Sequence, residues 1–148
     1  MSDDKIEILK SYSNIGEMIG YIKVEKIGVN LPIYDGTEDK VLLKGIGRMN
    51  LSNNHTILAG HTGLADKIMF DNLTNLEIGD LFCVTIFEDI FNYKICDIQQ
   101  VLPDEMDYLK KFFNENGEFV TLVTCSPRYI NSHRLLVTGK LLENCDEM

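Results

Sequence analysis

Short apolar runs separated by polar turns recur along the whole chain. Alternating apolar and polar positions are typical of half-buried strands, and compact runs of β-branched and aromatic residues are typical of buried ones. Together they predict strands over residues 19–27, 29–34, 55–61, 81–87, 91–101, 119–124 and 134–142. The second strand contains Pro32, which cannot donate a backbone hydrogen bond, so we place it at a sheet edge or a bulge.

Two segments carry helix signals. Thr37 is an N-cap residue ahead of an apolar cluster at 41–43, with glycines following. Pro103 and two acidic residues precede apolar positions at helical spacing, which predicts a helix over 104–113. Residues 50–54 are predicted to be a polar loop, and 64–76 helical turns or an ordered loop. The fold class is therefore mainly β, a closed or nearly closed barrel with short helices.

Length and charge narrow the function classes. A chain of 148 residues without a linker or repeat predicts one domain, 1–148, with flexible tails at 1–15 and 143–148. A net charge of -9 argues against nucleic acid or an anionic membrane surface as a partner. No apolar run reaches the roughly 18–20 residues of a membrane-spanning helix. The first five residues lack secretory-signal features, which leaves open a cytoplasmic protein or one whose anchor lies outside this sequence.

The four cysteines, Cys83, Cys96, Cys125 and Cys145, form no C-x-x-C pair and have no histidine at a zinc-ligand interval. We expect no metal site and no disulfide. Cys83 and Cys96 stand on predicted hairpin partners and could face each other, but buried free thiols are the expected state.

Three other positions have the chemistry of a catalytic site. Cys125 ends a predicted strand, and Arg134 begins the next strand after a polar loop, so a thiol and a guanidinium would meet at one sheet rim. A neighbouring cation favours the nucleophilic thiolate. His61 ends another strand and can exchange protons near neutral pH. Arg134 cannot act as a base, but it can stabilise a developing oxyanion.

Each of these residues also has an ordinary structural explanation. A strand cysteine is commonly a small buried apolar residue, a histidine before Thr-Gly can serve a turn, and an arginine at a strand start is commonly a solvated or ion-paired charge. Spacing alone leaves these alternatives open.

The motifs around these residues resemble those of the sortase family. The run Thr-Leu-Val-Thr-Cys at 121–125, an eight-residue loop and a final strand opened by Arg134 are similar to the sortase signature. Ile-Leu-Ala-Gly-His-Thr-Gly at 57–63 is similar to the family's histidine motif. The segments 19–22 and 27–37 are similar to its opening strands, so the resemblance covers about 19–142.

This resemblance implies an eight-stranded barrel and a ping-pong transpeptidation. The family cleaves a Leu-Pro-x-Thr-Gly-like sorting signal between Thr and Gly, holds the acyl group as a cysteine thioester and passes it to an amine, with hydrolysis as a side reaction. Carried over, Cys125 is the nucleophile, His61 the general acid/base and Arg134 the oxyanion group, while Thr124 would lie beside the reacting carbonyl. No cofactor is implied; calcium acts on some members, but no ligand set for it can be assigned here.

The loop 126–133 is most similar to class C, the pilin polymerases, which implies pilin sorting signals as donors and a pilin lysine as acceptor. The full-length protein is then expected to be anchored in the cell membrane of a Gram-positive bacterium, on its extracellular face. The absence of an Asp-Pro-aromatic lid motif also fits a class D or housekeeping enzyme that joins proteins to cell-wall precursors. A non-catalytic peptide-binding barrel is the alternative from another class. His55 and His133 are rivals for the proton role, disfavoured by their strand positions.

Overall fold

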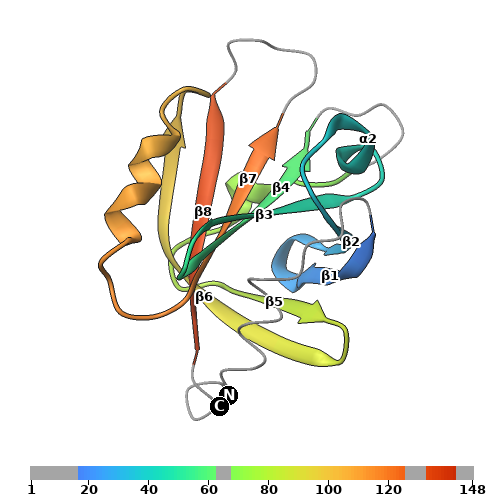
Figure 1. The fold of residues 1–148 in the computed structure, drawn as a ribbon, viewed down its shortest axis with the longest axis horizontal. Helices are drawn as coiled ribbons and strands as arrows, with labels where there is room; N and C mark the ends of the chain where they lie inside the picture. Colours follow the sequence, from blue (N-terminus) through green and yellow to red (C-terminus); the bar gives the residue numbers. More distant parts are fainter. Residues whose placement is uncertain (1–16, 63–67, 126–132, 143–148) are drawn as a thin grey trace.

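Eight strands close into a barrel in the order β1-β2-β3-β4-β7-β8-β6-β5 (Figure 1). The computed structural model describes residues 17–62, 68–125 and 133–142, with only the backbone of Asp39 and Cys125. The strands are β1 Met18–Val24, β2 Val29–Asp35, β3 Ile46–Ser52, β4 His55–His61, β5 Leu81–Ile86, β6 Asp89–Val101, β7 Phe119–Cys125 and β8 Arg134–Leu141. The helices are α2 Asp39–Leu42 and the 3-10 segments η1 Glu25–Ile27, η2 Leu73–Asn75 and η3 Met106–Phe112.

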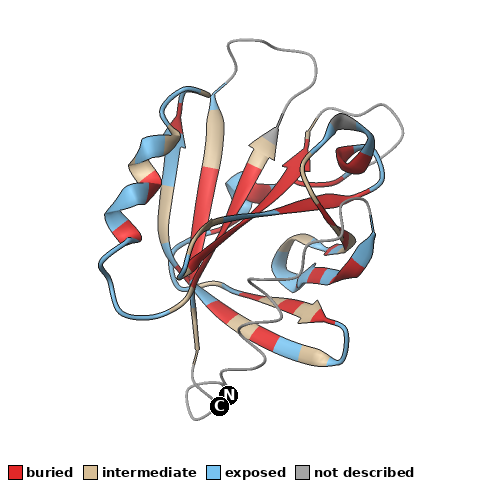
Figure 2. Ribbon diagram, viewed as in Figure 1, coloured by how far each residue is buried: buried red, intermediate tan, exposed pale blue. Residues whose placement is uncertain are grey.

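Strand alternation sends side chains to two separate cores. Inside the barrel, one face of every strand contributes to a large apolar cluster that includes Leu58, Leu122 and Val137. On the outer face of β4, β7 and β8, a second cluster packs against η3, which stands beside the barrel in Figure 1. Its members are Ile57, Val101, Leu109, Phe112, Phe119, Val123 and Leu136. The three strands are thus covered on both sides, and Figure 2 shows β4 and β7 buried over most of their length.

The predicted fold class is confirmed, together with most of the strands. The predicted hairpin of β5 and β6 pairs from Leu81 with Lys94 to Ile86 with Asp89. Pro32 lies where β2 is paired with β1 alone, since the pairing with β3 starts at Ile33, and the β1–β2 register shifts at Met18–Gly20. The predicted helix 104–113 is present as the shorter 3-10 helix η3.

Three local predictions were wrong. The segment 50–54 was expected to be a loop, but residues 50–52 complete β3, whose pairing with β4 supplies the hydrogen bonds that the polar sequence did not suggest. The strand expected over 19–27 ends at Val24, and η1 follows until Gly28, which has φ 69°. Thr37 was expected to be the N-cap of the first helix, but the Glu38 carbonyl accepts the first hydrogen bonds of α2, from the N–H groups of Val41 and Leu42.

The cysteine predictions need one correction. Cys83 is opposite Asn92, so it does not face Cys96, and neither cysteine forms a disulfide. Cys96 is exposed rather than buried, because it is the extra residue where the β6–β8 register shifts between Ile95 and Asp97. Cys145 and both predicted tails fall outside the described residues. Within the described ranges, no helix is long and apolar enough to span a bilayer.

Candidate active site

β4 and β7 run parallel, and their register brings two of the predicted site residues together. Pairing begins with His55 opposite Phe119 and continues without a shift to His61 opposite Cys125. The two residues are therefore partners at the ends of neighbouring strands, although 64 positions separate them in the sequence.

β8 flanks β7 on its other side and begins with the third predicted residue, Arg134. The antiparallel pairing of these strands reaches Val123 opposite Leu136. Each further step moves one residue forward on β7 and one back on β8, so two steps lead from this pair to Cys125 and Arg134. On its far side, Arg134 pairs with Val101 of β6.

The same face of the sheet carries this row of residues. Ile57, Val123 and Leu136 point outward to the cluster beneath η3. Side chains alternate along a strand, so His61 and Arg134 share this outward parity, four residues after Ile57 and two before Leu136. Cys125 stands at the next position of the same alternation on β7, two residues after Val123.

The end of β4 is held in place by tight packing. His61 is only 6% exposed, and its carbonyl accepts a 3.2 Å hydrogen bond from the backbone N–H of Phe70. The ring of Phe70 also occupies the space beside Gly60, so Phe70 packs against the end of β4. The His61 backbone therefore has little freedom to move away from β7.

Thr124 belongs to the opposite parity from Cys125. Its hydroxyl accepts a 2.9 Å hydrogen bond from the backbone N–H of Leu135. This bond links the end of β7 to the beginning of β8. The hydroxyl thus has a positioning contact next to Arg134, and the substrate contact predicted for Thr124 stays a prediction.

The two rival histidines lie elsewhere. His133 is exposed and precedes Arg134 directly. His55 is buried at the far end of β4, where its Nε2 lies 2.6 Å from the Thr121 hydroxyl, which lies 2.7 Å from the hydroxyl of Thr138. Burial lowers the pKa of His55 to about 4, so its imidazole is neutral at physiological pH.

Sequence analysis missed this hydrogen-bonded chain and also a buried ion pair. Arg48 Nη1 donates a 2.8 Å hydrogen bond to Asp35 Oδ1, and both side chains are almost fully buried. The members of each group come from separate strands, so no local sequence signal marks them. Of the loop between Cys125 and Arg134, residues 126–132 lie outside the described residues. In the part of the chain that is described, no three His, Cys, Asp or Glu side chains gather into a metal site.

Comparison with known proteins identifies the family to which this chain is similar. The family model described as "Sortase domain" matches residues 22–142. Sortase C-1 from Actinomyces oris is 40% identical with a TM-score of 0.75, covering 86% of this chain and 76% of that one. Clostridium perfringens sortase C, solved with the C-terminal cell wall sorting motif, is 31% identical with a TM-score of 0.78, covering 97% and 92%.

Among curated relatives, sortase A of Bacillus anthracis is 24% identical over 143 residues, which are 94% of this chain and 67% of that protein. The chain spans between 41% and 67% of the length of the curated relatives it matches. The match to the family model covers most of the chain, and it includes the strands that carry His61, Cys125 and Arg134. The chain therefore belongs to the sortases, a family of cysteine transpeptidases.

Proposed function

We propose that this chain catalyses transpeptidation with Cys125 as nucleophile, His61 as general acid and base, and Arg134 as the oxyanion-stabilising group. One observation carries the proposal: His61 and Cys125 are register partners at the ends of β4 and β7, and Arg134 opens the strand on the other side of β7. A thiol, an imidazole and a guanidinium at one strand rim match the requirements of covalent acyl transfer.

In the first half-reaction, the Cys125 thiolate attacks the carbonyl carbon of the scissile peptide bond and forms a C–S bond. The tetrahedral intermediate then collapses, the C–N bond breaks, and the leaving amine takes a proton from the His61 imidazolium. The products are a thioester on Cys125 that carries the amino-terminal part of the substrate, a neutral His61 and a released carboxy-terminal fragment with a new free amine.

In the second half-reaction, an acceptor amine attacks the thioester carbonyl. A new C–N bond forms, the C–S bond breaks, and the amine proton passes to His61, which regenerates the thiolate and the imidazolium. The Arg134 guanidinium can donate hydrogen bonds to the carbonyl oxygen in both tetrahedral intermediates, where negative charge develops on that oxygen.

The proposed donor is an LPXTG-like sorting signal cleaved between Thr and Gly, and the proposed acceptor is a pilin lysine. Support comes from the sortase C structures among the neighbours, one of which is a pilus-related sortase C of Group B Streptococcus. The Clostridium perfringens enzyme was solved with the C-terminal cell wall sorting motif. Thr124 is proposed to contact the substrate carbonyl region, and the full-length enzyme to act at the Gram-positive cell surface.

A second candidate has its own support. Sortase A of Corynebacterium diphtheriae is 30% identical with a TM-score of 0.76, and Bacillus subtilis sortase D is among the curated relatives. An enzyme of that kind would deliver the thioester to the amine of a cell-wall precursor. The two candidates share every step except the identity of the final amine.

Mass spectrometry of the reaction products tests both halves of the proposal. The enzyme is incubated with LPXTG-like peptides and either a pilin-derived lysine peptide or a cell-wall-type amine, such as diaminopimelate. We expect an acyl adduct on Cys125 and an amide to the lysine peptide, and no adduct in Cys125→Ala. Transfer to the cell-wall amine alone would select the second candidate. If peptide binds and stays intact with every amine, the chain is a binding module.

A further inference from the structure

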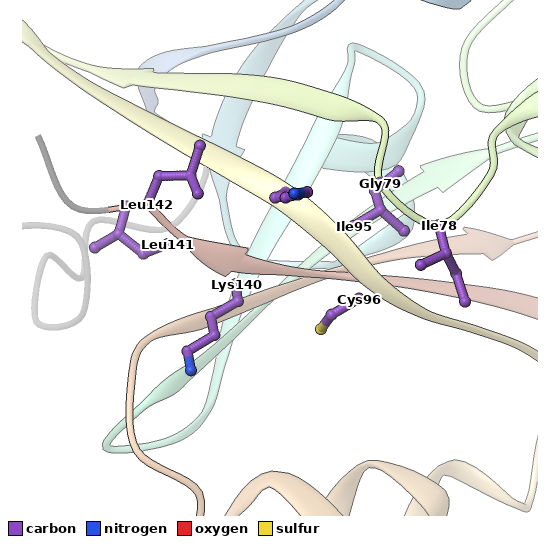
Figure 3. A pocket seen from close by; sticks show the side chains of 8 residues that line it. Ile78, Gly79, Ile95, Cys96, Lys140, Leu141 and Leu142 are labelled. Carbon is purple, nitrogen blue, oxygen red and sulfur yellow. The ribbon is translucent and has the colours of Figure 1, made fainter. Parts of the chain in front are cut away.

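A pocket of about 510 Å³ opens near the end of β8, away from the candidate active site. Figure 3 shows it between β6, β8 and the segment before β5. It is lined by Ile78, Gly79, Lys94, Ile95, Cys96, Lys140, Leu141 and Leu142. Lys140 is six residues from Arg134 along β8, a separation of roughly 20 Å for an extended strand. The pocket is therefore independent of the proposed chemistry.

Backbone hydrogen bonds fix the walls of this pocket. The N–H of Gly79 donates to the carbonyl of Ile95 at 2.8 Å, and the N–H of Ile95 donates to the carbonyl of Asp80 at 2.8 Å. On the other side, the N–H of Leu142 donates to the carbonyl of Asn92 at 2.9 Å. Both walls are held against β6, so the pocket is formed before any ligand enters, as is usual for small-molecule sites.

Two lysines stand directly opposite each other in this pocket. Lys94 of β6 and Lys140 of β8 are register partners, and like charges at such positions repel and destabilise a sheet. Among the described residues, neither ammonium forms a salt bridge with a carboxylate. The net charge of the protein is -9, so a pair of adjacent cations stands out against the overall charge.

The remaining walls are mainly apolar. Ile78 is 68% exposed, which is a large apolar surface to leave in water. Leu141 and Leu142, at the opposite end of the pocket in Figure 3, are partly exposed. In Figure 3, Lys140 and Cys96 extend to the same side of the strands. A ligand here meets ammonium groups next to hydrocarbon.

We propose that this pocket binds a small amphiphilic anion, with its head group between the ammoniums of Lys94 and Lys140 and its hydrocarbon chain against Ile78. An anion between the two lysines would convert their repulsion into two charge-assisted contacts. Burial of the chain would remove apolar surface from water. Carboxylate and phosphate head groups both satisfy this chemistry, so the source is either a fatty acid or an alkyl phosphate.

Calorimetric titration with octanoate and with octyl phosphate tests the site, and the tighter of the two identifies the source. Octanol and acetate serve as probes that lack either the charge or the chain. We expect saturable one-to-one binding of an anion and about fivefold weaker binding in Lys94→Gln and in Lys140→Gln. Lys23→Gln removes an equal charge from an exposed position on β1 and is expected to leave the affinity unchanged.

The alkylation rate of Cys96, followed by peptide mapping, reports occupancy independently, because this exposed thiol lines the pocket. The bound anion is expected to slow alkylation of Cys96 at least threefold in the wild type and not in the Lys94→Gln, Lys140→Gln double variant. Equal binding of octanol and octanoate overturns the proposal. So does an equal loss of affinity in Lys23→Gln, since it would mean that only overall charge matters.

Discussion

The ring of Phe70 fills the space beside Gly60 in which a side chain would otherwise stand. A Cβ atom at position 60 would lie 2.6 and 2.7 Å from two ring carbons of Phe70 and 2.8 Å from Cδ1 of Ile46. Gly60→Ala must therefore displace Phe70, whose N–H also holds the His61 carbonyl. We expect a loss of about 1–3 kcal/mol of stability from overpacking and at least a tenfold fall in kcat, measured by denaturant unfolding and peptide turnover.

Gly139→Ala is the matched control for this variant. A Cβ at Gly139 would lie 2.6 and 2.8 Å from the ring of Phe82, also in the barrel interior but near the other end of β8. It should destabilise the protein by a similar amount and leave kcat of the folded enzyme near the wild-type value. Equal losses of kcat in both variants would mean that general destabilisation, not displacement of His61, accounts for the effect.

Arg134 should be required for the rate and dispensable for the fold. Replacing it with Gln removes the proposed oxyanion donor, and loss of one such donor lowers kcat by about 10²–10³-fold. Arg134→Lys retains the positive charge but lacks the planar set of guanidinium donors, so its kcat should lie between those of Arg134→Gln and the wild type. Steady-state kinetics measures both effects, and Lys140→Gln, on the same strand, should keep the wild-type kcat. A near-normal rate in Arg134→Gln contradicts the assigned role.

Thr124→Val tests whether the hydroxyl positions the strand or contacts the substrate. The variant leaves the N–H of Leu135 without its acceptor, at a cost of about 1–3 kcal/mol, and loosens the start of β8 where Arg134 lies. We expect kcat to fall with KM nearly unchanged, and Thr124→Ser to restore both stability and rate. A rise in KM alone would instead identify Thr124 as a substrate-binding residue.

The strands, and the positions of Cys125 and Arg134 at strand ends, could be predicted from sequence because their signals are local. The apolar run ending at Cys125 and the strand opened by Arg134 carry their own periodicity, and strand ends place residues at a sheet rim. The motif order then linked His61 to them. The structure adds the parallel register of β4 and β7, which pairs residues too distant in sequence for any local pattern to relate.

The missed features depend on partners elsewhere in the chain. β3 carries polar residues such as Asn50, so its strand conformation comes from pairing with β4 and not from its own sequence. The exposure of Cys96 results from a register shift between β6 and β8. Asp35 and Arg48 form a buried ion pair across two strands, which no spacing in the sequence suggests.

His55 should make stability depend on pH. The folded state keeps this imidazole neutral down to about pH 4 because of burial, whereas the unfolded chain binds a proton near pH 6.5. Below pH 6.5 the unfolded state holds more protons, so the free energy of unfolding falls as the pH drops toward 4. We expect a contribution of about 1–3 kcal/mol over this range, measured by urea unfolding at each pH.

The difference between wild type and His55→Gln isolates this contribution from that of the carboxylates. Glutamine can retain a hydrogen bond to Thr121 but does not titrate, so the variant should lose less stability between pH 6.5 and 4. His133→Gln, at an exposed position, should follow the wild-type curve. Parallel curves for wild type and His55→Gln would show that His55 does not set this dependence.

Breaking the ion pair of Asp35 and Arg48 by removing one partner should destabilise the protein far more than breaking an exposed pair of the same length. Both this pair and that of Lys26 with Asp80 have N···O distances of 2.8 Å, but the first is almost fully buried and the second is partly exposed. Arg48→Met leaves a carboxylate buried without this partner, so we expect a loss of about 3–5 kcal/mol in urea unfolding. Lys26→Gln should cost at most about 1 kcal/mol. Adding Asp35→Asn to Arg48→Met removes the buried carboxylate charge that has lost its partner, and it should recover most of the lost free energy of unfolding. Without such recovery, Arg48 would be stabilising the barrel through its packing instead of its charge.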